Sequence, residues 1–326
     1  MNRFIIIDGH ALIYRSFYAF PELTDPQGRL VNAVYGFTRI MLTAIRDFEP
    51  EYIAVAFDHK APTKRSETFE AYKAQRAPMP EELKGQIQIV KDVVTALNIP
   101  QFELAGFEAD DLIGTIALQL QESGQLHDDD TERGDGLQMM IITGDKDLLQ
   151  LVNDHVRVFI PGRGKFSRDK EYDAAGVQEK MGVMPAQVVD LKALMGDTSD
   201  NIPGVKGIGP KTAVQLISDF GSLDGVYKRV ESKADQASDA PAGEGTPVIK
   251  SSVLEKLKQD KTNAYLSQQL ATIEQTAPIS FDLAACSVME YDKDKVAKVF
   301  EDLNFDSLVQ LLPKDSFEQG VQEALF

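Results

Sequence analysis

The chain has 326 residues, 43% of them hydrophobic, and its 51 acidic residues outnumber its 34 basic residues, which gives a net charge of -17. This length and apolar content are enough to bury a full core, so we expect one larger and one smaller domain. The single cysteine, Cys286, excludes an internal disulfide, and no apolar run is long enough for a signal peptide or a membrane span. We therefore expect a monomeric, cytoplasmic protein without membrane contact.

Short apolar runs alternate with longer amphipathic stretches in the first half of the chain. The runs cover residues 4–7, 52–57, 101–104, 139–143 and 156–160. Between them, apolar side chains recur at helical spacing in residues 33–48, 82–97 and 109–122. This alternation is typical of a mostly parallel sheet flanked by helices, so the predicted fold class is α/β.

The second half is predicted to be helical from about residue 173, with Pro185 and Pro210 at helix starts. Two segments do not fit either pattern. Residues 59–80 are basic and rich in proline, so we expect a mobile excursion there, and residues 232–247 are low in complexity, so we expect disorder. The predicted units are a core over residues 1–172, a helical region over residues 173–312 and a tail over residues 313–326.

Acidic side chains follow the predicted strands at the points where the strands end. Asp8 ends the first strand, Asp58 ends the second, and a Glu-Ala-Asp-Asp sequence follows the third. Because ligands of an open α/β sheet collect at the carboxyl ends of its strands, we expect these groups to converge. Asp145 and Asp147 follow the fourth strand, and two more aspartates come from the helical region. The set is Asp8, Asp58, Glu108, Asp110, Asp111, Asp145, Asp147, Asp197 and Asp200.

Nine carboxylates around one crevice predict a metal site. Carboxylates packed this closely cannot all stay ionised without cations between them, and oxygen ligands without His or Cys favour Mg²⁺ or Mn²⁺ over zinc. Two such ions about 3.5 to 4 Å apart would activate a water and stabilise the leaving oxygen of a phosphodiester. One such residue alone, for example Asp8, is more often a helix N-cap or a surface charge, so the metal interpretation depends on the whole set.

Residues 196–213 join two of these carboxylates to a glycine-rich turn. The turn contains three glycines and two lysines, Gly204, Lys206, Gly207, Gly209 and Lys211. The glycines indicate a hairpin too tight for side chains, and Pro210 lies where a helix would begin. Free backbone N–H groups at a helix N-terminus favour a phosphate, and the two lysines can neutralise a sugar-phosphate backbone without reading a base.

Basic side chains are grouped in the sequence despite the negative net charge. One cluster lies in residues 60–91 and another in residues 157–170. A DNA-binding face is therefore compatible with the composition, and its affinity would depend strongly on salt. Lys73 and Arg76 lie on a segment with little apolar support, which favours a functional role for them.

Aromatic residues follow the first strand. They are Tyr14, Phe17 and Tyr18, and the basic Arg15 lies among them. They fit the inner face of a helix, and they fit equally well a surface that stacks on bases and holds a phosphate. The sequence leaves both interpretations open.

Six motifs resemble those of the flap endonuclease family, most closely the 5' nuclease domain at the N-terminus of bacterial DNA polymerase I. The motifs are Ile-Asp-Gly-His at Asp8, Ala-Phe-Asp at Asp58, Tyr-Lys-Ala-Gln-Arg at Lys73, Glu-Ala-Asp-Asp at Glu108, Thr-Gly-Asp-Lys-Asp at Asp145 and the run over residues 196–213. The resemblance extends from residue 1 to about residue 312. It implies a core that resembles a PIN domain, a helical arch over residues 59–80, and a helix-hairpin-helix over residues 197–220 that grips duplex DNA, often with K⁺.

The resemblance also implies a role for each matching residue. The first metal would be held by Asp8, Asp58, Glu108 and Asp110, and the second by Asp111, Asp145, Asp147 and Asp200, with Asp197 acting through water. The scissile phosphate would be held by Arg15, Lys73 and Arg76. The nucleotide beside the cut would stack on Tyr14, Phe17 or Tyr18. The uncut duplex strand would be anchored by Gly204, Lys206, Gly207, Gly209 and Lys211.

The activity implied is that of a metal-dependent 5'-3' exonuclease and flap endonuclease, which hydrolyses DNA flaps or RNA primers at nicks during replication and repair. A catalytically idle DNA-junction protein is disfavoured because no member of the carboxylate set is replaced. A phosphatase on a similar core would need an Asp-x-Asp pair after the first strand, but Gly9 and His10 follow Asp8. A ribonuclease would have no use for the hairpin.

The last five residues, Gln-Glu-Ala-Leu-Phe, resemble short peptides that dock on the bacterial sliding clamp. Leu325 and Phe326 would fill an apolar pocket, and Gln322 would form a hydrogen bond at its rim. A last helical turn packed on the core would have the same pattern. Because the sequence ends soon after the resemblance does, we expect either a stand-alone nuclease or a separated fragment of a polymerase.

Overall fold

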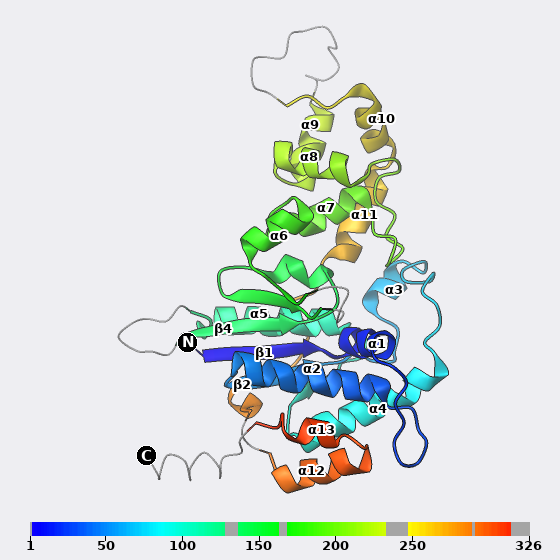
Figure 1. Ribbon diagram of the computed structural model, residues 1–326. Coiled ribbons are helices and arrows are strands. Elements are labelled where there is room, and N and C mark those ends of the chain that lie inside the picture. Colours follow the sequence, from blue (N-terminus) through cyan, green and yellow to red (C-terminus); the bar gives the residue numbers. More distant parts are fainter. Residues whose placement is uncertain (1, 128–135, 163–167, 233–246, 289–290, 314–326) are drawn as a thin grey trace.

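The computed structural model describes residues 2–127, 136–162, 168–232, 247–288 and 291–313, and Figure 1 shows an α/β body with a helical region stacked at one end. Most of the segment 232–247, where we expect disorder, lies outside these residues. The clamp motif at Gln322, Leu325 and Phe326 also lies outside them. Among the described helices, none is long and apolar enough to cross a membrane.

A six-stranded sheet forms the centre of the body. Its strands are β1 (Asn2–Asp8), β2 (Tyr52–Ala56), β3 (Gln101–Phe102), β4 (Leu137–Ile142), β5 (Val156–Ile160) and β6 (Lys170–Tyr172). The order across the sheet is β3-β2-β1-β4-β5-β6, and all neighbours are parallel except β5 and β6. The predicted mostly parallel α/β fold is therefore confirmed. The antiparallel edge strand β6 was not predicted, because its Lys-Glu-Tyr sequence is short and polar.

The central strand β1 sends alternate side chains into two hydrophobic cores. Phe4 and Ile6 face one core, Ile5 and Ile7 face the other, and all four are fully buried. The second core is covered by α1 (Gly9–Ala19), α2 (Asn32–Phe48), α4 (Glu81–Ala96), α12 (Lys293–Asp302) and α13 (Asp306–Val309). A strand that is apolar on both faces belongs in the middle of a sheet, which is where β1 lies.

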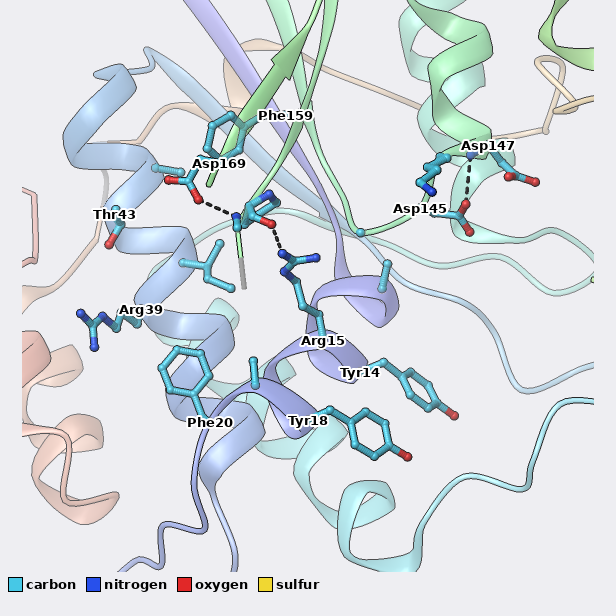
Figure 2. Close-up of a pocket in the computed structure, with 18 of the residues that line it drawn as sticks. Tyr14, Arg15, Tyr18, Phe20, Arg39, Thr43, Asp145, Asp147, Phe159 and Asp169 are labelled. Atoms are coloured by element: carbon cyan, nitrogen blue, oxygen red, sulfur yellow. Dashed lines mark hydrogen bonds between the residues drawn. The ribbon is translucent and has the colours of Figure 1, made fainter. Parts of the chain in front are cut away.

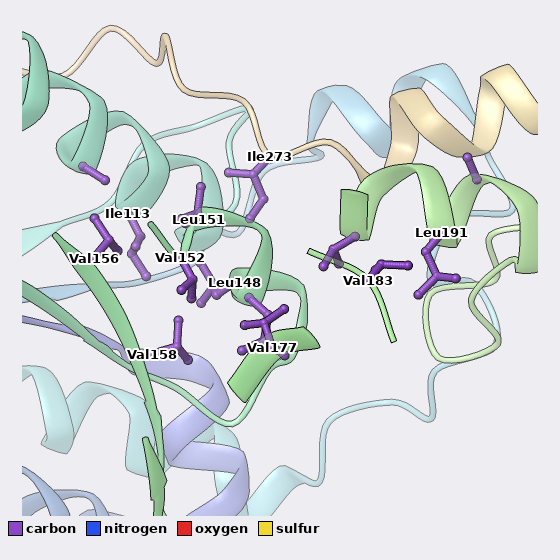
Figure 3. Packing of buried hydrophobic residues seen from close by; sticks show 14 of the residues in the cluster. Ile113, Leu148, Leu151, Val152, Val156, Val158, Val177, Val183, Leu191 and Ile273 are labelled. Carbon is purple, nitrogen blue, oxygen red and sulfur yellow. The ribbon is translucent and has the colours of Figure 1, made fainter. Parts of the chain in front are cut away.

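The opposite face of the sheet is covered by α5 (Ala109–Glu122) and joins the helical region. That region contains α6 (Ala174–Met181), η3 (Pro185–Gln187), α7 (Val188–Met195), α8 (Pro210–Phe220), α9 (Leu223–Glu231), α10 (Ser251–Gln259) and α11 (Lys261–Ala271), and η5 (Ala284–Cys286) follows it. Figure 3 shows how Leu148 from η1 (Asp147–Leu151), Val177 and Leu191 share one core. Helices begin at Pro185 and Pro210, as predicted.

The segment 59–80 contains one short helix, α3 (Lys64–Thr68), capped by the Thr63 hydroxyl. Its remaining residues form turns that contact the body. Tyr72 is buried, and the Lys73 amide donates a hydrogen bond to the Asp200 carbonyl (2.9 Å). The segment therefore bridges the sheet and the helical region, and we call residues 59–80 the arch.

Candidate active site

The carboxyl ends of the central strands lie side by side. Asp8 is paired with Ala56 across β1 and β2, and Ile7 is paired with Ile142 across β1 and β4. This register brings Thr143, the residue after β4, next to Asp8, and the Thr143 hydroxyl donates to Asp8 Oδ2 (2.7 Å). The other oxygen of Asp8 accepts the Ala11 amide (3.1 Å) at the start of α1. Asp8 is thus both an N-cap and a buried member of the carboxylate set.

Two further strand ends supply carboxylates to the same place. Asp58, after β2, accepts the Ala109 amide through Oδ1 (2.8 Å), which joins this strand end to the start of α5. Asp145, after β4, accepts the Asp147 amide through Oδ1 (2.9 Å). Gly9 lets these ends approach, because a Cβ atom there would lie 2.5 Å from the Phe57 ring.

Burial and mutual repulsion raise the pKa of several of these groups. Burial, together with Asp58 and Asp145, raises the pKa of Asp8 to about 7. Burial and the charges of Asp145 and Asp8 raise the pKa of Asp110 well above its usual value. Burial and Asp145 raise the pKa of Asp147 to about 7, although Lys192 opposes the shift. We call Asp8, Asp58, Asp110 and Asp145 the inner carboxylates.

The other five carboxylates each contact a basic side chain. They are Glu108, Asp111, Asp147, Asp197 and Asp200, which we call the outer carboxylates. On the arch, Lys73 Nζ lies 2.7 Å from Glu108 Oε2 and Arg76 Nη2 lies 2.6 Å from Asp200 Oδ1. Between these two pairs, the buried Tyr72 hydroxyl lies 3.2 Å from Glu108 and 3.3 Å from Asp200. The arch thus places positive charge directly over the strand ends.

Asp111 has a structural role in this arrangement. It forms a capping box with Glu108, whose amide it accepts through Oδ2 (3.0 Å), and it also accepts the Glu274 amide through Oδ1 (2.9 Å). Arg65 binds both Asp111 oxygens, at 2.9 and 2.6 Å. With both oxygens engaged, Asp111 is not placed to bind a metal ion here, and this geometry does not support its assignment to the second metal.

The chemistry of the inner carboxylates fits a hard divalent cation. They are oxygen donors, they repel one another, and two of them have a raised pKa, so a positive ion among them would remove an electrostatic penalty. Within the part of the chain that the structure describes, no three acidic, His or Cys side chains are grouped so as to hold a metal ion as they stand. Ligand binding at this site therefore requires small side-chain movements.

A cleft of about 2200 Å³ passes the strand ends. Its lining includes Asp145, Asp147 and Arg76, and it extends from Leu311 near α13 to Pro210 at the start of α8. Figure 2 shows Tyr14 and Tyr18 projecting from α1 in a common direction, beside the strand ends. An open groove that passes a carboxylate set suits an extended polymer.

The four residues named in α1 (Tyr14, Arg15, Phe17 and Tyr18) differ in whether they pack on the core or face the solvent. Tyr14 and Phe17 pack partly on the core, whereas Tyr18 is 73% exposed. Arg15 donates a hydrogen bond to the Pro161 carbonyl in this conformation. Stacking by these aromatic residues and phosphate contact by Arg15 stay predictions.

The predicted hairpin lies between α7 and α8. Gly204 and Gly207 have positive φ angles of 63° and 80°, and a Cβ atom at Gly204 would lie 2.3 Å from the Gly196 amide nitrogen. Gly209 differs: its φ is -99°, and a Cβ atom there would have no neighbour within 4 Å. The expectation that all three glycines avoid side-chain crowding is therefore wrong for Gly209. Lys206 and Lys211 are exposed on either side of it.

Three site residues were missed in the sequence. Tyr72 and Arg65 lie in the arch, where a basic, proline-rich composition indicated exposure. Lys192 on α7 contacts both Asp147 and Asp197, the latter at 2.6 Å, and is almost fully buried. A signal for Lys192 was available, because it is a single lysine in the apolar stretch of residues 188–195. Although burial opposes the shift, Lys192 and Ser199 hold the pKa of Asp197 below its usual value.

Family comparisons match nearly the whole described chain. A family model described as "5'-3' exonuclease, N-terminal resolvase-like domain" matches residues 3–182. A second, described as "5'-3' exonuclease, C-terminal SAM fold", matches residues 183–294. The predicted boundary after residue 172 stays a prediction.

The curated relatives are longer proteins. The chain is 39% identical over 312 residues to DNA polymerase I of Caldicellulosiruptor bescii, a match that covers 95% of the chain and 33% of that protein. It is 36% identical over 324 residues to DNA polymerase I of Bacillus subtilis, covering 99% of the chain and 34% of that protein. The chain thus spans about a third of the length of these relatives.

Solved structures share the fold at low identity. A flap endonuclease of bacteriophage T5, crystallised with DNA and metal ions, superposes with a TM-score of 0.60 at 21% identity and covers 95% of this chain and 99% of its own. A flap endonuclease from Methanococcus jannaschii superposes with a TM-score of 0.57 at 16% identity, covering 95% and 90% of the two chains. At these identities the likeness concerns the fold.

Proposed function

Because the chain belongs to the 5'-3' exonuclease family, we propose that it is a structure-selective 5' nuclease that hydrolyses phosphodiesters of DNA flaps or of RNA primers at nicks. The observation that carries this proposal is the convergence of Asp8, Asp58, Asp110 and Asp145 beside a long open cleft. The DNA and metal ions in the crystals of the bacteriophage T5 flap endonuclease are consistent with it.

The inner carboxylates would hold divalent metal, and we favour Mg²⁺ or Mn²⁺ because the donors are oxygen atoms. Glu108 and Asp200 lie on the edge of the set and would complete a second site once Lys73 and Arg76 turn to the substrate. Such ions would supply an activated water and charge stabilisation at the scissile phosphodiester. Lys73 and Arg76 would bind the phosphate oxygens and stabilise the charge that develops on them.

The hairpin between α7 and α8 would grip the duplex. Gly204 lets the hairpin pack closely on Gly196, and the exposed Gly207 would leave the backbone open to a phosphate. The exposed Lys206 and Lys211 would pair with neighbouring phosphates without reading bases. The open space at Gly209 leaves room for a strand to approach the N-terminus of α8. Binding of K⁺ at this hairpin, the monomeric state and the cytoplasmic location stay predictions from the sequence.

Cleavage of a 5'-end-labelled flap on a nicked duplex would test the proposal. The reactions would contain Mg²⁺ or EDTA, and a blunt duplex and a single strand would serve as controls. We expect short labelled products from the flap only, and only with Mg²⁺. Tight junction binding without cleavage would favour the alternative function, that of a non-catalytic DNA-junction protein.

We also propose that the C-terminal residues dock on a sliding clamp through Gln322, Leu325 and Phe326. The support is the sequence pattern alone. Deleting residues 322–326 and measuring binding to the clamp would test the proposal, and unchanged affinity would contradict it. Flap cleavage without the clamp should be unaffected by the deletion.

A further inference from the structure

Arg65 is a basic arch residue whose side chain points inward. Its side chain is 11% exposed, and its guanidinium forms two hydrogen bonds with Asp111 (2.9 and 2.6 Å). The same group donates to the carbonyls of Leu270 (3.1 Å) and Thr272 (2.8 Å) at the end of α11, and it lies 3.4 Å from Glu108. Arg65 therefore joins three separate elements, α3, α5 and α11, at the base of the arch.

Lys192, which lines the cleft, makes a similar connection between elements. Its side chain is 4% exposed and extends from α7. The ammonium contacts Asp147, on η1 directly after the strand end, and Asp197, at the start of the hairpin (2.6 Å). Lys192 thus connects the edge of the carboxylate set to the hairpin.

The donors of both residues are already used inside the protein. Four N–H···O contacts saturate most of the Arg65 guanidinium, and two carboxylates share the Lys192 ammonium. A buried cation satisfied in this way cannot also bind a phosphate unless it breaks those contacts. Lys206 and Lys211, by contrast, are exposed and lie at the hairpin.

On the premise of the proposed nuclease function, we infer that Arg65 and Lys192 are positioning residues and do not contact DNA. Arg65 fixes the base of the arch, and so places Lys73 over the strand ends. Lys192 fixes Asp147 relative to Asp197, and so sets the hairpin in place beside the inner carboxylates. Each acts on the reaction through the residues that it holds.

The test separates binding from cleavage. Arg65→Gln and Lys192→Gln would be compared with Lys206→Gln and with Lys298→Gln, which changes an exposed lysine on α12 that does not line the cleft. Flap affinity would be measured in EDTA over a range of salt, and the single-turnover cleavage rate would be measured with Mg²⁺ at saturating flap.

We expect the saturated rate to fall at least about tenfold in the two positioning variants, while the log–log slope of affinity against salt stays that of the wild type. Lys206→Gln should lower the magnitude of the slope by about 0.9, the loss of one phosphate contact. Lys298→Gln should change neither quantity. A slope lowered by Arg65→Gln or Lys192→Gln, or a saturated rate that both variants leave unchanged, would overturn the inference.

Thermal unfolding curves show whether a variant has lost cleavage because it no longer folds. If Arg65→Gln is unfolded at the assay temperature, Arg65→Lys carries the test, because it keeps one ion pair with Asp111 and loses the two-pronged geometry. Its saturated rate should lie between those of the wild type and a fully inactive enzyme, with an unchanged salt slope. Failure of the wild type to cleave would contradict the proposed function instead, and the binding slopes would still report whether Arg65 and Lys192 contact DNA.

Discussion

The Asp8 carboxyl is buried without a basic partner among the described residues, whereas each outer carboxylate contacts a lysine or an arginine. Its neighbours at the strand ends, Asp58 and Asp145, carry charge of the same sign. A divalent ion would remove this repulsion, and protons would do so when no metal is bound. The inner and outer carboxylates therefore differ in what neutralises them.

This difference predicts how stability depends on pH. The pKa values of Asp8 and Asp147 are raised to about 7, above their unfolded values, so the folded protein binds more protons than the unfolded chain between about pH 4 and pH 7. Without metal, these two groups make the protein less stable as pH rises through that window. We expect Mg²⁺ to raise the thermal midpoint more at pH 7.5 than at pH 5, measured by scanning fluorimetry.

The control for this experiment is Asp8→Asn, which removes one of the two groups. The extra stabilisation by Mg²⁺ at the higher pH should shrink in this variant. An equal shift of the midpoint at both pH values in the wild type would argue against metal binding among the inner carboxylates.

The Asp145→Asn variant tests the role of the inner carboxylates directly. The change keeps the shape of the side chain but removes a charge from the centre of the inner carboxylates. We expect cleavage at saturating flap to fall at least about 100-fold, in the range seen when one electrostatic group is removed from an active site. DNA affinity in EDTA should stay close to that of the wild type, because the hairpin lysines are intact. Full turnover by this variant would refute the metal assignment.

Lys73→Ala should have a different signature. Lys73 lies over the strand ends, 2.7 Å from Glu108, and we place it on the scissile phosphate during the reaction. Its loss should slow cleavage about 10- to 100-fold and weaken binding by less than that, because a single phosphate contact disappears from many. Single-turnover rates and EDTA binding curves measure both effects. A loss of affinity as large as the loss of rate would place Lys73 in binding alone.

At the scale of elements, the hairpin between α7 and α8 is held by its backbone and by α11. The Ser267 hydroxyl accepts the Gly204 amide (2.9 Å), and Asp260 accepts the Lys206 amide (2.8 Å). Gly204 is confined by Gly196, whose backbone it nearly touches. The shape of the hairpin is therefore set before any DNA arrives.

Two glycine substitutions distinguish residues that maintain the shape of the hairpin from residues that contact DNA. Gly204→Ala should destabilise the protein by about 1 to 3 kcal/mol, because it combines a positive φ with a steric clash, and it should weaken DNA binding. Gly209→Ala has an ordinary φ and open space around it, so the thermal midpoint should hardly change. If Gly209→Ala weakens DNA binding at an unchanged midpoint, a strand approaches the hairpin at that point. A large loss of stability in Gly209→Ala would contradict the geometry.

The sequence predicted the elements where one physical signal dominated. Five strands begin and end within two residues of their apolar runs, because buried parallel strands are continuously apolar. The apolar signal failed for β6, because two of its three residues, Lys170 and Glu171, are charged. Burial of Lys192 was not predicted, because a lysine in a helix is normally solvated. Convergence of the strand-end carboxylates followed from topology. Their division into inner and outer carboxylates did not, because it depends on contacts between residues as distant as Lys73 and Asp200.

At the scale of the whole molecule, the net charge of -17 coexists with a cleft that carries local positive charge. The charge of the outer carboxylates is compensated in part by Lys73, Arg76 and Lys192. Exposed lysines remain at the hairpin, and Lys146 lies in the cleft beside Asp145. Overall charge therefore says little about this surface.

We expect flap binding in EDTA to weaken steeply with salt. If Lys146, Lys206 and Lys211 each neutralise one phosphate, the log–log slope should be about -2.7, and steeper if further contacts form. Fluorescence anisotropy between low and physiological salt measures this slope. A slope near zero would show that the cleft does not bind a nucleic-acid backbone.

The carboxylates of the site come from sequence positions as far apart as Asp8 and Asp200, at the carboxyl ends of strands and in the helical region. During synthesis, the ribosome has therefore released most of the described chain before the last of these groups can reach the first. If the protein is the nuclease proposed above, a nascent chain that lacks the hairpin and Asp200 would not yet cut nucleic acid. The separation of these residues along the sequence would then delay the onset of cleavage until the hairpin has been made.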